Sequence, residues 1–398
     1  MDVNPAFARM GEENAFAVLA RATELAEAGR SIINLGIGQP DFETPEHVCE
    51  AAVRAIRDGA HGYTPALGTR AAREAVARRT LHMTGVEVSP DRIAVVPGGK
   101  VTMFAAILML GGEGREVLYP DPGFPIYRSM IEFTGAKPVP IPLREENGLA
   151  FSADEVLELV TDRTSLVILN SPGNPTGGVA PRAEFDRLAA GLERHPHVSI
   201  LSDEIYDAML YDGAEHTSML RYEGLRDRLV VLNGWSKTWA MTGWRMGWGI
   251  WPEALIEPVR KLAVNCWSCV NAPSQAAGIA AIDGPQEPVH AMMEAFRGRR
   301  RLIVDRLNAL PGITCTEPRG AFYAFPNVSA LGLPAKELAR TWLEDLGVAT
   351  IGGPDFGVYG EGFVRFSYAN SEAAIEEALR RIEGWLDTHD RRNKVPGK

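Results

Sequence analysis

The sequence predicts an α/β protein with a mostly parallel, doubly wound sheet in a large domain and a smaller α/β domain beside it. Three short apolar runs carry this prediction, at residues 166–169, 198–201 and 229–232. Runs this short and this rich in Val, Ile and Leu are typical of strands covered on both faces. A helical stretch, 183–192, separates the first two runs. Because strands that alternate with helices form parallel sheets, we expect ligands beyond the carboxyl ends of these strands.

A short polar segment follows each of the three runs. These segments are Ser171–Gly177, Ser202–Tyr206 and Ser236–Arg245. If the strands are parallel neighbours, their carboxyl ends meet at one edge of the sheet. Five side chains that are far apart in sequence should therefore converge on one crevice: Asn174, Asp203, Tyr206, Lys237 and Arg245.

These side-chain types match the chemistry of pyridoxal phosphate (PLP). A lysine beside an apolar strand end can lose its proton and form a Schiff base with an aldehyde. A carboxylate can keep a pyridinium nitrogen protonated, while a Tyr hydroxyl and an Asn amide can bond a phenolic oxygen. An Arg can bind a phosphate through two parallel hydrogen bonds. The convergent set therefore predicts a PLP pocket, in which the protonated ring serves as an electron sink for carbanions.

In order and spacing, the three segments resemble motifs of the fold-type I, class I aminotransferases, in the branch with bacterial aspartate and aromatic aminotransferases. Ser236–Gly247 resembles the cofactor-lysine motif, and Asn174–Gly177 and Asp203–Tyr206 resemble two further motifs. The resemblance covers nearly the whole chain. It implies an L-amino acid and a 2-oxo acid as substrates and a ping-pong cycle through a Lys237 Schiff base. It also implies a homodimer with shared active sites.

Under this resemblance, Lys237, Asp203 and Tyr206 are the catalytic residues. Lys237 moves a proton from the substrate Cα to the cofactor, and Asp203 keeps the ring nitrogen protonated. Tyr206 and Asn174 bond the ring oxygen, and Asn174 is counted among the substrate-binding residues as well.

The resemblance also assigns roles outside the three segments. Tyr63 matches a tyrosine that reaches across a dimer interface to the partner's cofactor phosphate. Phe124 matches an aromatic residue that stacks on the pyridine ring, and Gly38 matches a backbone contact to the substrate carboxylate. Arg365, in the predicted strand Phe363–Ser367, matches the arginine that binds the α-carboxylate, for which a planar guanidinium offers two parallel bonds.

A phosphate cradle is predicted where glycines open a helix after a strand. Gly98, Gly99 and Lys100 occupy such a position, and backbone N–H groups at a helix start attract anions. Relatives often carry a hydroxyl residue three positions before the lysine, where this chain has Gly234. Ser236, directly before the lysine, is the hydroxyl residue included in the predicted cofactor site.

Charge, hydropathy and cysteine content argue against nucleic-acid binding, a membrane location and a metal site. A net charge of −10 leaves no basic excess for nucleic acid. No apolar run reaches about 18 residues, and no signal peptide is visible, so we expect a cytoplasmic protein away from membranes. Cys266 and Cys269 have the spacing of a redox or metal pair, but no second pair or His cluster lies nearby, so we predict no metal site.

The length of 398 residues allows two or three domains. We predict an N-terminal segment (1–45) that packs with the small domain and the active site, a large PLP-binding domain (46–280) and a small domain (281–398) built around a βαβ-like unit. At the end of the N-terminal segment, Thr44 is the expected N-cap of a helix that begins at Pro45.

Four functions other than transamination fit the sequence to different degrees. A carbon–sulfur β-lyase and a synthase that eliminates at Cγ would share every cofactor residue, so both stay open. A non-enzymatic aminotransferase-like sensor domain would carry a DNA-binding domain, for which residues 1–30 are too short. A nicotinamide dehydrogenase is disfavoured because Gly36 and Gly38 lack the third glycine of the dinucleotide fingerprint.

Overall fold

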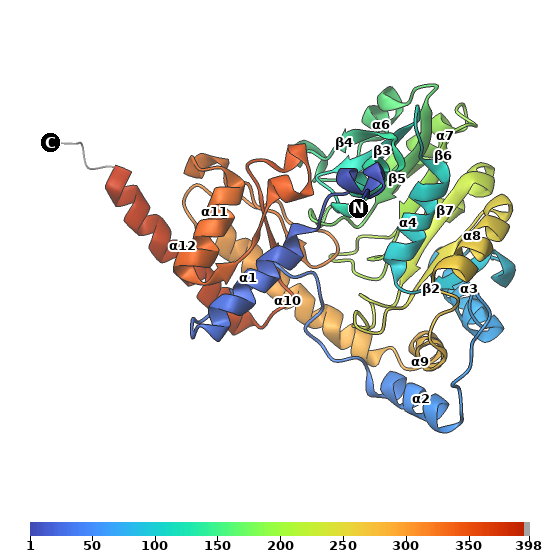
Figure 1. Ribbon diagram of the computed structural model, residues 1–398. Coiled ribbons are helices and arrows are strands. Elements are labelled where there is room, and N and C mark those ends of the chain that lie inside the picture. Colours follow the sequence, from blue (N-terminus) through green and yellow to red (C-terminus); the bar gives the residue numbers. More distant parts are fainter. Residues whose placement is uncertain (394–398) are drawn as a thin grey trace.

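The computed structural model describes residues 1–393. Its central feature is a seven-stranded sheet in the order β2-β8-β7-β6-β5-β3-β4 (Figure 1). Strand β8 runs antiparallel to both of its neighbours, and all other adjacent pairs are parallel. The strands are β2 (Ile93–Val96), β3 (Glu116–Asp121), β4 (Lys137–Pro142), β5 (Thr164–Asn170), β6 (Ser199–Asp203), β7 (Leu229–Gly234) and β8 (Gly247–Ile250).

The three apolar runs that predicted the sheet are β5, β6 and β7, which are consecutive neighbours. Asn170 pairs with Asp203, and Asp203 pairs with Leu232. The carboxyl ends of the three strands therefore lie at the same edge, as the sequence predicts. This register brings the three polar segments that follow them into one neighbourhood.

Helices cover both faces of this sheet (Figure 1). On β5, Val167 and Leu169 belong to one apolar core, whereas Leu166 and Ile168 belong to another on the opposite face. This alternation is the period of two expected of a strand buried on both sides. One face is covered by α3 (Arg70–Thr84), α6 (Ala153–Leu159), α7 (Arg182–Leu192) and α9 (Ala272–Asp283), and the other by α4 (Gly99–Leu110), α5 (Ile126–Thr134) and α8 (Glu253–Cys266).

A third core lies between the C-terminal elements, and its largest buried side chains include Phe296, Phe322 and Trp342. The long helices α10 (Glu287–Ala309) and α12 (Glu372–Asn393) pack against each other there. A small antiparallel sheet, β11-β12-β9, completes this part. Its strands are β9 (Tyr323–Ala324), β11 (Ile351–Gly352) and β12 (Val364–Ser367).

The predicted βαβ-like unit is wrong, because the three strands of this sheet are antiparallel. After β9, the chain continues through α11 (Ala335–Thr341) and a π-helical turn to β10 (Val348–Ala349). Strand β10 pairs in parallel with β1 (Ile33–Asn34), which comes from the N-terminal segment. The crossover helix therefore leads away from the sheet that contains β9.

The N-terminal segment also contributes α1 (Asn14–Glu27), whose Ala22 and Leu25 pack with Leu343 and Ala349. The domain boundaries after residues 45 and 280 stay a prediction. No helix within residues 1–393 has the combination of length and apolar character needed to span a bilayer.

The predicted start of the next helix is wrong by one residue. Helix α2 (Glu46–Arg57) has Pro45 as its N-cap and ends at the expected residue. The hydroxyl of Thr44 instead donates a hydrogen bond to the Ala240 carbonyl (2.9 Å) and accepts one from the Trp244 indole (3.0 Å). Thr44 therefore ties the N-terminal segment to the loop that carries Lys237.

Candidate active site

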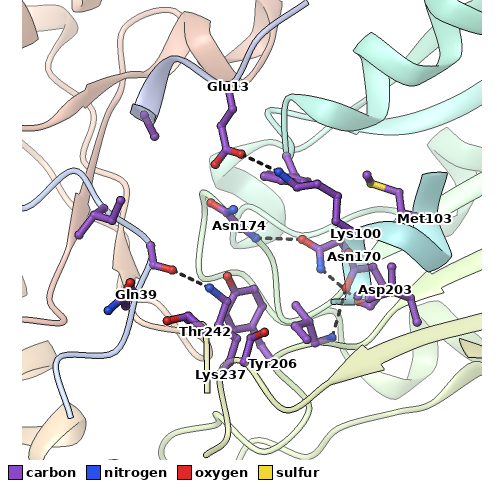
Figure 2. Close-up of a pocket in the computed structure, with 18 of the residues that line it drawn as sticks. Glu13, Gln39, Lys100, Met103, Asn170, Asn174, Asp203, Tyr206, Lys237 and Thr242 are labelled. Atoms are coloured by element: carbon purple, nitrogen blue, oxygen red, sulfur yellow. Dashed lines mark hydrogen bonds and ion pairs between the residues drawn. The ribbon is translucent and has the colours of Figure 1, made fainter. Parts of the chain in front are cut away.

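A cavity of about 540 Å³ opens at the carboxyl ends of β5, β6 and β7 (Figure 2). Its volume is in the range of small-molecule sites. All residues of the predicted site line it except Gly98 and Tyr63. The lining thus includes Gly38, Gly99, Lys100, Phe124, Asn174, Asp203, Tyr206, Ser236, Lys237, Arg245 and Arg365.

Lys237 lies in the turn that follows β7, and its ammonium group donates a hydrogen bond to the Gly38 carbonyl (2.5 Å; Figure 2). Burial lowers the pKa of Lys237 to about 8. The positive charges of Arg365 and Arg245 act in the same direction, while Glu13 and Asp203 oppose them. A large fraction of this lysine is therefore neutral in mildly alkaline solution, the state in which an amine is a nucleophile and a base.

Asp203 ends β6 and is buried. Its carboxylate accepts hydrogen bonds from the Tyr127 hydroxyl (2.6 Å) and from the backbone N–H of Ile205 (3.2 Å). Burial raises the pKa of Asp203 to about 6, although both hydrogen bonds oppose the shift. A buried carboxylate with this pKa favours a cationic partner on its open side.

Tyr206 is held beside Asp203 by a second tyrosine. Its hydroxyl lies 2.8 Å from the hydroxyl of Tyr323, and the two rings meet edge to face. Burial raises the pKa of Tyr206 well above its usual value. The phenol is therefore protonated at physiological pH and able to donate a hydrogen bond into the cavity.

Arg365 lies in β12 and is only 2% exposed. Its guanidinium donates to the Asn174 side-chain oxygen (2.9 Å) and to the Gly36 carbonyl (2.5 Å), and it lies 4.8 Å from the centroid of the Tyr323 ring. Its Nε has no hydrogen-bond partner within the described residues. A buried guanidinium that lines a cavity fits an anionic ligand such as a carboxylate.

Gly98 makes room for Arg245 at the start of α4 without lining the cavity. It caps α4 with a φ of +89°, and a Cβ there would lie 2.3 Å from the Arg245 guanidinium. Only glycine therefore lets Arg245 approach the start of α4, where the backbone N–H groups of the first turn lack intrahelical acceptors. Arg245 donates to the Thr242 carbonyl (2.9 Å), which fixes the guanidinium there.

The Lys100 side chain turns away from that helix start. Its ammonium forms an ion pair with Glu13 (3.2 Å; Figure 2) and lies 5.2 Å from the centroid of the Phe124 ring. Only the backbone N–H of Lys100, and not its side chain, is therefore available at the first turn of α4.

The remaining predicted residues differ in position. Ser236 is buried in the lining. Gly38 packs so closely that a Cβ would lie 2.5 Å from the Tyr323 hydroxyl. Tyr63, by contrast, is 92% exposed in the loop between α2 and α3.

Several residues of the site were missed by the sequence analysis. Asn170 donates to the Asp203 carbonyl (3.0 Å) and accepts from the Asn174 backbone N–H (3.0 Å). Its place at the end of β5, in register with Asp203, was a usable signal. Tyr127 and Glu13 carry no such signal, because their partners lie 76 and 87 residues away in sequence.

Comparisons with known proteins agree with this geometry. The family model for aminotransferase class I and II matches residues 30–382. An aspartate aminotransferase from Geobacillus stearothermophilus is 37% identical over 377 residues, covering 93% of this chain and 95% of that protein. Aromatic-amino-acid aminotransferase 2 from Thermococcus litoralis is 36% identical over 363 residues, covering 90% of this chain and 93% of that protein.

Comparison with solved structures also identifies aminotransferases. The aspartate aminotransferase from Thermus thermophilus with maleate superposes with a TM-score of 0.92 at 34% identity, covering 96% of this chain and 99% of that chain. The enzyme from Rhizobium meliloti superposes with a TM-score of 0.92 at 35% identity, covering 97% and 99%. The predicted family, fold class and transaminase activity are thereby confirmed, and the chain belongs to the class I and II aminotransferases, a family of enzymes that use PLP.

Proposed function

We propose that this aminotransferase binds PLP in the cavity at the ends of β5, β6 and β7 and exchanges amino groups between L-amino acids and 2-oxo acids. The observation that carries the proposal is Lys237, a half-buried lysine with a lowered pKa, in the same cavity as Asp203 and Arg365. The chemistry requires three groups: an amine to attach the cofactor, a carboxylate to bind its cationic ring, and a guanidinium to bind the substrate carboxylate.

The phosphate site is assigned to the start of α4. The backbone N–H groups of Gly99 and Lys100 and the helix dipole attract an anion, and the Arg245 guanidinium adds a positive charge. Gly98 supplies the space for Arg245, and Ser236 supplies a buried hydroxyl in the lining.

The ring site is assigned to residues at the strand ends. Asp203, oriented by Tyr127, would bind the protonated ring nitrogen, and Tyr206 and Asn174 would donate to the ring oxygen. Phe124 offers the aromatic face. PLP supplies an electron sink that stabilises negative charge at the substrate Cα.

Substrate handling is assigned to Lys237 and Arg365. The Arg365 guanidinium and its partner Asn174 would bind the α-carboxylate of the substrate, with the Gly38 backbone as a further contact. Lys237, with a pKa near 8, would take the proton from the substrate Cα and deliver it to the former aldehyde carbon of PLP, C4′. Because names of relatives include aspartate and aromatic amino acids, we take these two classes as the first donors to test.

Reductive labelling tests the cofactor assignment. Purified enzyme loaded with PLP should absorb in the visible range and lose that band on borohydride treatment, with the label recovered on Lys237. Recovery on Lys100 or Lys261 would contradict the assignment. In the same preparation, an amino donor should yield its 2-oxo acid without ammonia, whereas ammonia release would instead indicate a β- or γ-elimination.

The quaternary proposal is a symmetric homodimer in which Tyr63 acts on the partner's phosphate. Its support is the 92% exposure of Tyr63 and its position outside the cavity of its own chain. Mixing Lys237→Ala and Tyr63→Ala dimers under subunit exchange should restore about a quarter of wild-type activity, because one site in each heterodimer carries neither change. The test requires that Tyr63→Ala alone is strongly impaired. If the mixed dimers then recover no activity, Tyr63 acts within its own subunit.

Compartment and domain boundaries complete the proposal. We propose a cytoplasmic enzyme with boundaries after residues 45 and 280. Cell fractionation tests the first statement, and limited proteolysis with mass analysis of the fragments tests the second.

A further inference from the structure

We propose that Glu13 sets the substrate class by neutralising Lys100 at the cavity mouth and repelling a second carboxylate. The enzyme would then prefer amino acids with uncharged side chains, above all aromatic ones, over dicarboxylic amino acids. This inference rests on the proposed function of the cavity and adds a specificity-determining residue to it.

The first support is that the position of Glu13 is held from both sides. The backbone of Gly11 exchanges two hydrogen bonds with the Ser129 hydroxyl (3.0 and 3.1 Å), which ties the segment to α5. Asn14 donates to the Asp355 carboxylate (2.6 Å), which ties it to the C-terminal part of the chain. Glu13 is the N-cap of α1 but makes no capping hydrogen bond, so its carboxylate extends into the cavity.

The second support is the effect of the Glu13 charge on the basic side chains of the cavity. The Glu13 carboxylate lies 3.2 Å from the Lys100 ammonium (Figure 2). Of the charged groups that act on Lys237, Glu13 has the largest effect: it raises the pKa of that lysine, whereas burial lowers it. Glu13 also raises the pKa of Arg365. The charge of Glu13 therefore acts on both groups assigned to the substrate, the one for the amino nitrogen and the one for the α-carboxylate.

The third support is the distribution of cations. Within the described residues, four basic side chains line the cavity: Lys100, Lys237, Arg245 and Arg365. Three have assigned tasks in the proposed function, so Lys100 is the one left for a second substrate carboxylate. Lys100 is already paired with Glu13, and a dicarboxylic substrate would have to break that pair and bring two carboxylates close together.

The fourth support is the apolar part of the cavity lining. The Lys100 ammonium lies 5.9 Å from the centroid of the Phe16 ring, and Ala15, Ile37 and Met103 line the cavity with it. An aromatic or aliphatic substrate side chain would pack against these groups without any charge to satisfy.

The test compares holoenzymes of wild type, Glu13→Gln and Glu12→Gln in the half-reaction with phenylalanine or aspartate. Wild type should show kcat/KM for phenylalanine above that for aspartate, and Glu13→Gln should shift the ratio toward aspartate by at least about tenfold. Glu12→Gln is the matched control, because Glu12 is the exposed neighbour outside the cavity lining, and its ratio should equal that of wild type.

Two further measurements separate charge from altered packing. Calorimetric binding of non-reacting maleate should strengthen in Glu13→Gln, while binding of 3-phenylpropionate should change much less. Adding Lys100→Met to Glu13→Gln should remove the gain for aspartate and for maleate, since the freed ammonium is the group expected to bind the second carboxylate.

A wild-type preference for aspartate, or equal ratios in Glu13→Gln and Glu12→Gln, would overturn this inference while leaving the proposed transamination intact. A protein that binds PLP but converts no amino acid would overturn both. A gain that survives Lys100→Met would overturn the role of the Glu13–Lys100 pair.

Discussion

The floor and the mouth of the cavity are built in different ways. The floor consists of side chains at the ends of β5, β6 and β7, where the register of a sheet covered on both faces places Asn174, Asp203 and Lys237. The mouth carries Glu13, whose segment is attached to other parts of the chain by hydrogen bonds of Gly11 and Asn14. This difference suggests that the reaction resides in the floor and the choice of substrate in the mouth. Floor substitutions should therefore abolish chemistry for every substrate, whereas mouth substitutions should change rates selectively.

Asp203→Asn should have the largest effect, because it removes the negative charge that would stabilise a protonated ring. We expect half-transamination to slow about a thousandfold, or ~4 kcal/mol of activation free energy, with all donors alike. Stopped-flow absorbance of the PLP-loaded enzyme measures this rate. Tyr127→Phe, which removes one hydrogen bond to the same carboxylate, should slow it far less. Near-normal turnover of Asp203→Asn would place the ring partner elsewhere.

Arg365→Lys keeps the charge but loses the planar pair of donors. Apparent affinity for amino and oxo substrates should fall about a hundredfold, equivalent to ~2.7 kcal/mol, and equally for aspartate and phenylalanine. Arg306→Lys, at a surface ion pair with Glu383, is the control and should change nothing. A loss confined to one substrate class would move Arg365 from the shared carboxylate site to the specificity pocket.

The raised pKa of Asp203 predicts a pH dependence of stability in the PLP-free protein. Folding raises this pKa from 3.8 to about 6, so the folded state binds more protons than the unfolded state between those values. The contribution of Asp203 is therefore most favourable in acid and is lost as pH rises through 6, by about 2 kcal/mol between pH 4 and pH 7. Denaturant unfolding of wild type and Asp203→Asn at both pH values measures it. Parallel pH profiles would contradict the assignment.

Asn14→Ala should have the smallest effect, because it removes one tether of the mouth. We expect the free energy of unfolding to fall by about 1 kcal/mol. Borohydride labelling of Lys237 should be unchanged, since the floor does not depend on this hydrogen bond. Calorimetry and the labelling assay check the two halves of the prediction. Loss of labelling would show that floor and mouth are coupled.

The sequence by itself determined the floor, because each of its groups directly follows an apolar strand. Once β5, β6 and β7 are parallel neighbours, Asn174, Asp203 and Lys237 have to meet at one edge. Patterns of this kind are local and are legible in a single chain. The phosphate site at Gly98 and Gly99 was predicted for the same reason, since it follows β2 and opens α4.

Only the tertiary structure decided which distant groups complete the site. The Tyr127–Asp203, Tyr206–Tyr323 and Gly36–Arg365 contacts join residues 76, 117 and 329 positions apart, and no local pattern encodes such pairs. The same holds for the parallel pairing of β1 with β10 and for the antiparallel pairing of β12 with β9 and β11, which replaces the predicted βαβ-like unit. Glu13 could be read from sequence as an ordinary acidic residue before a helix. Its position opposite Lys100 follows from the packing of the N-terminal segment against both parts of the chain, because contact at this range is set by the whole fold.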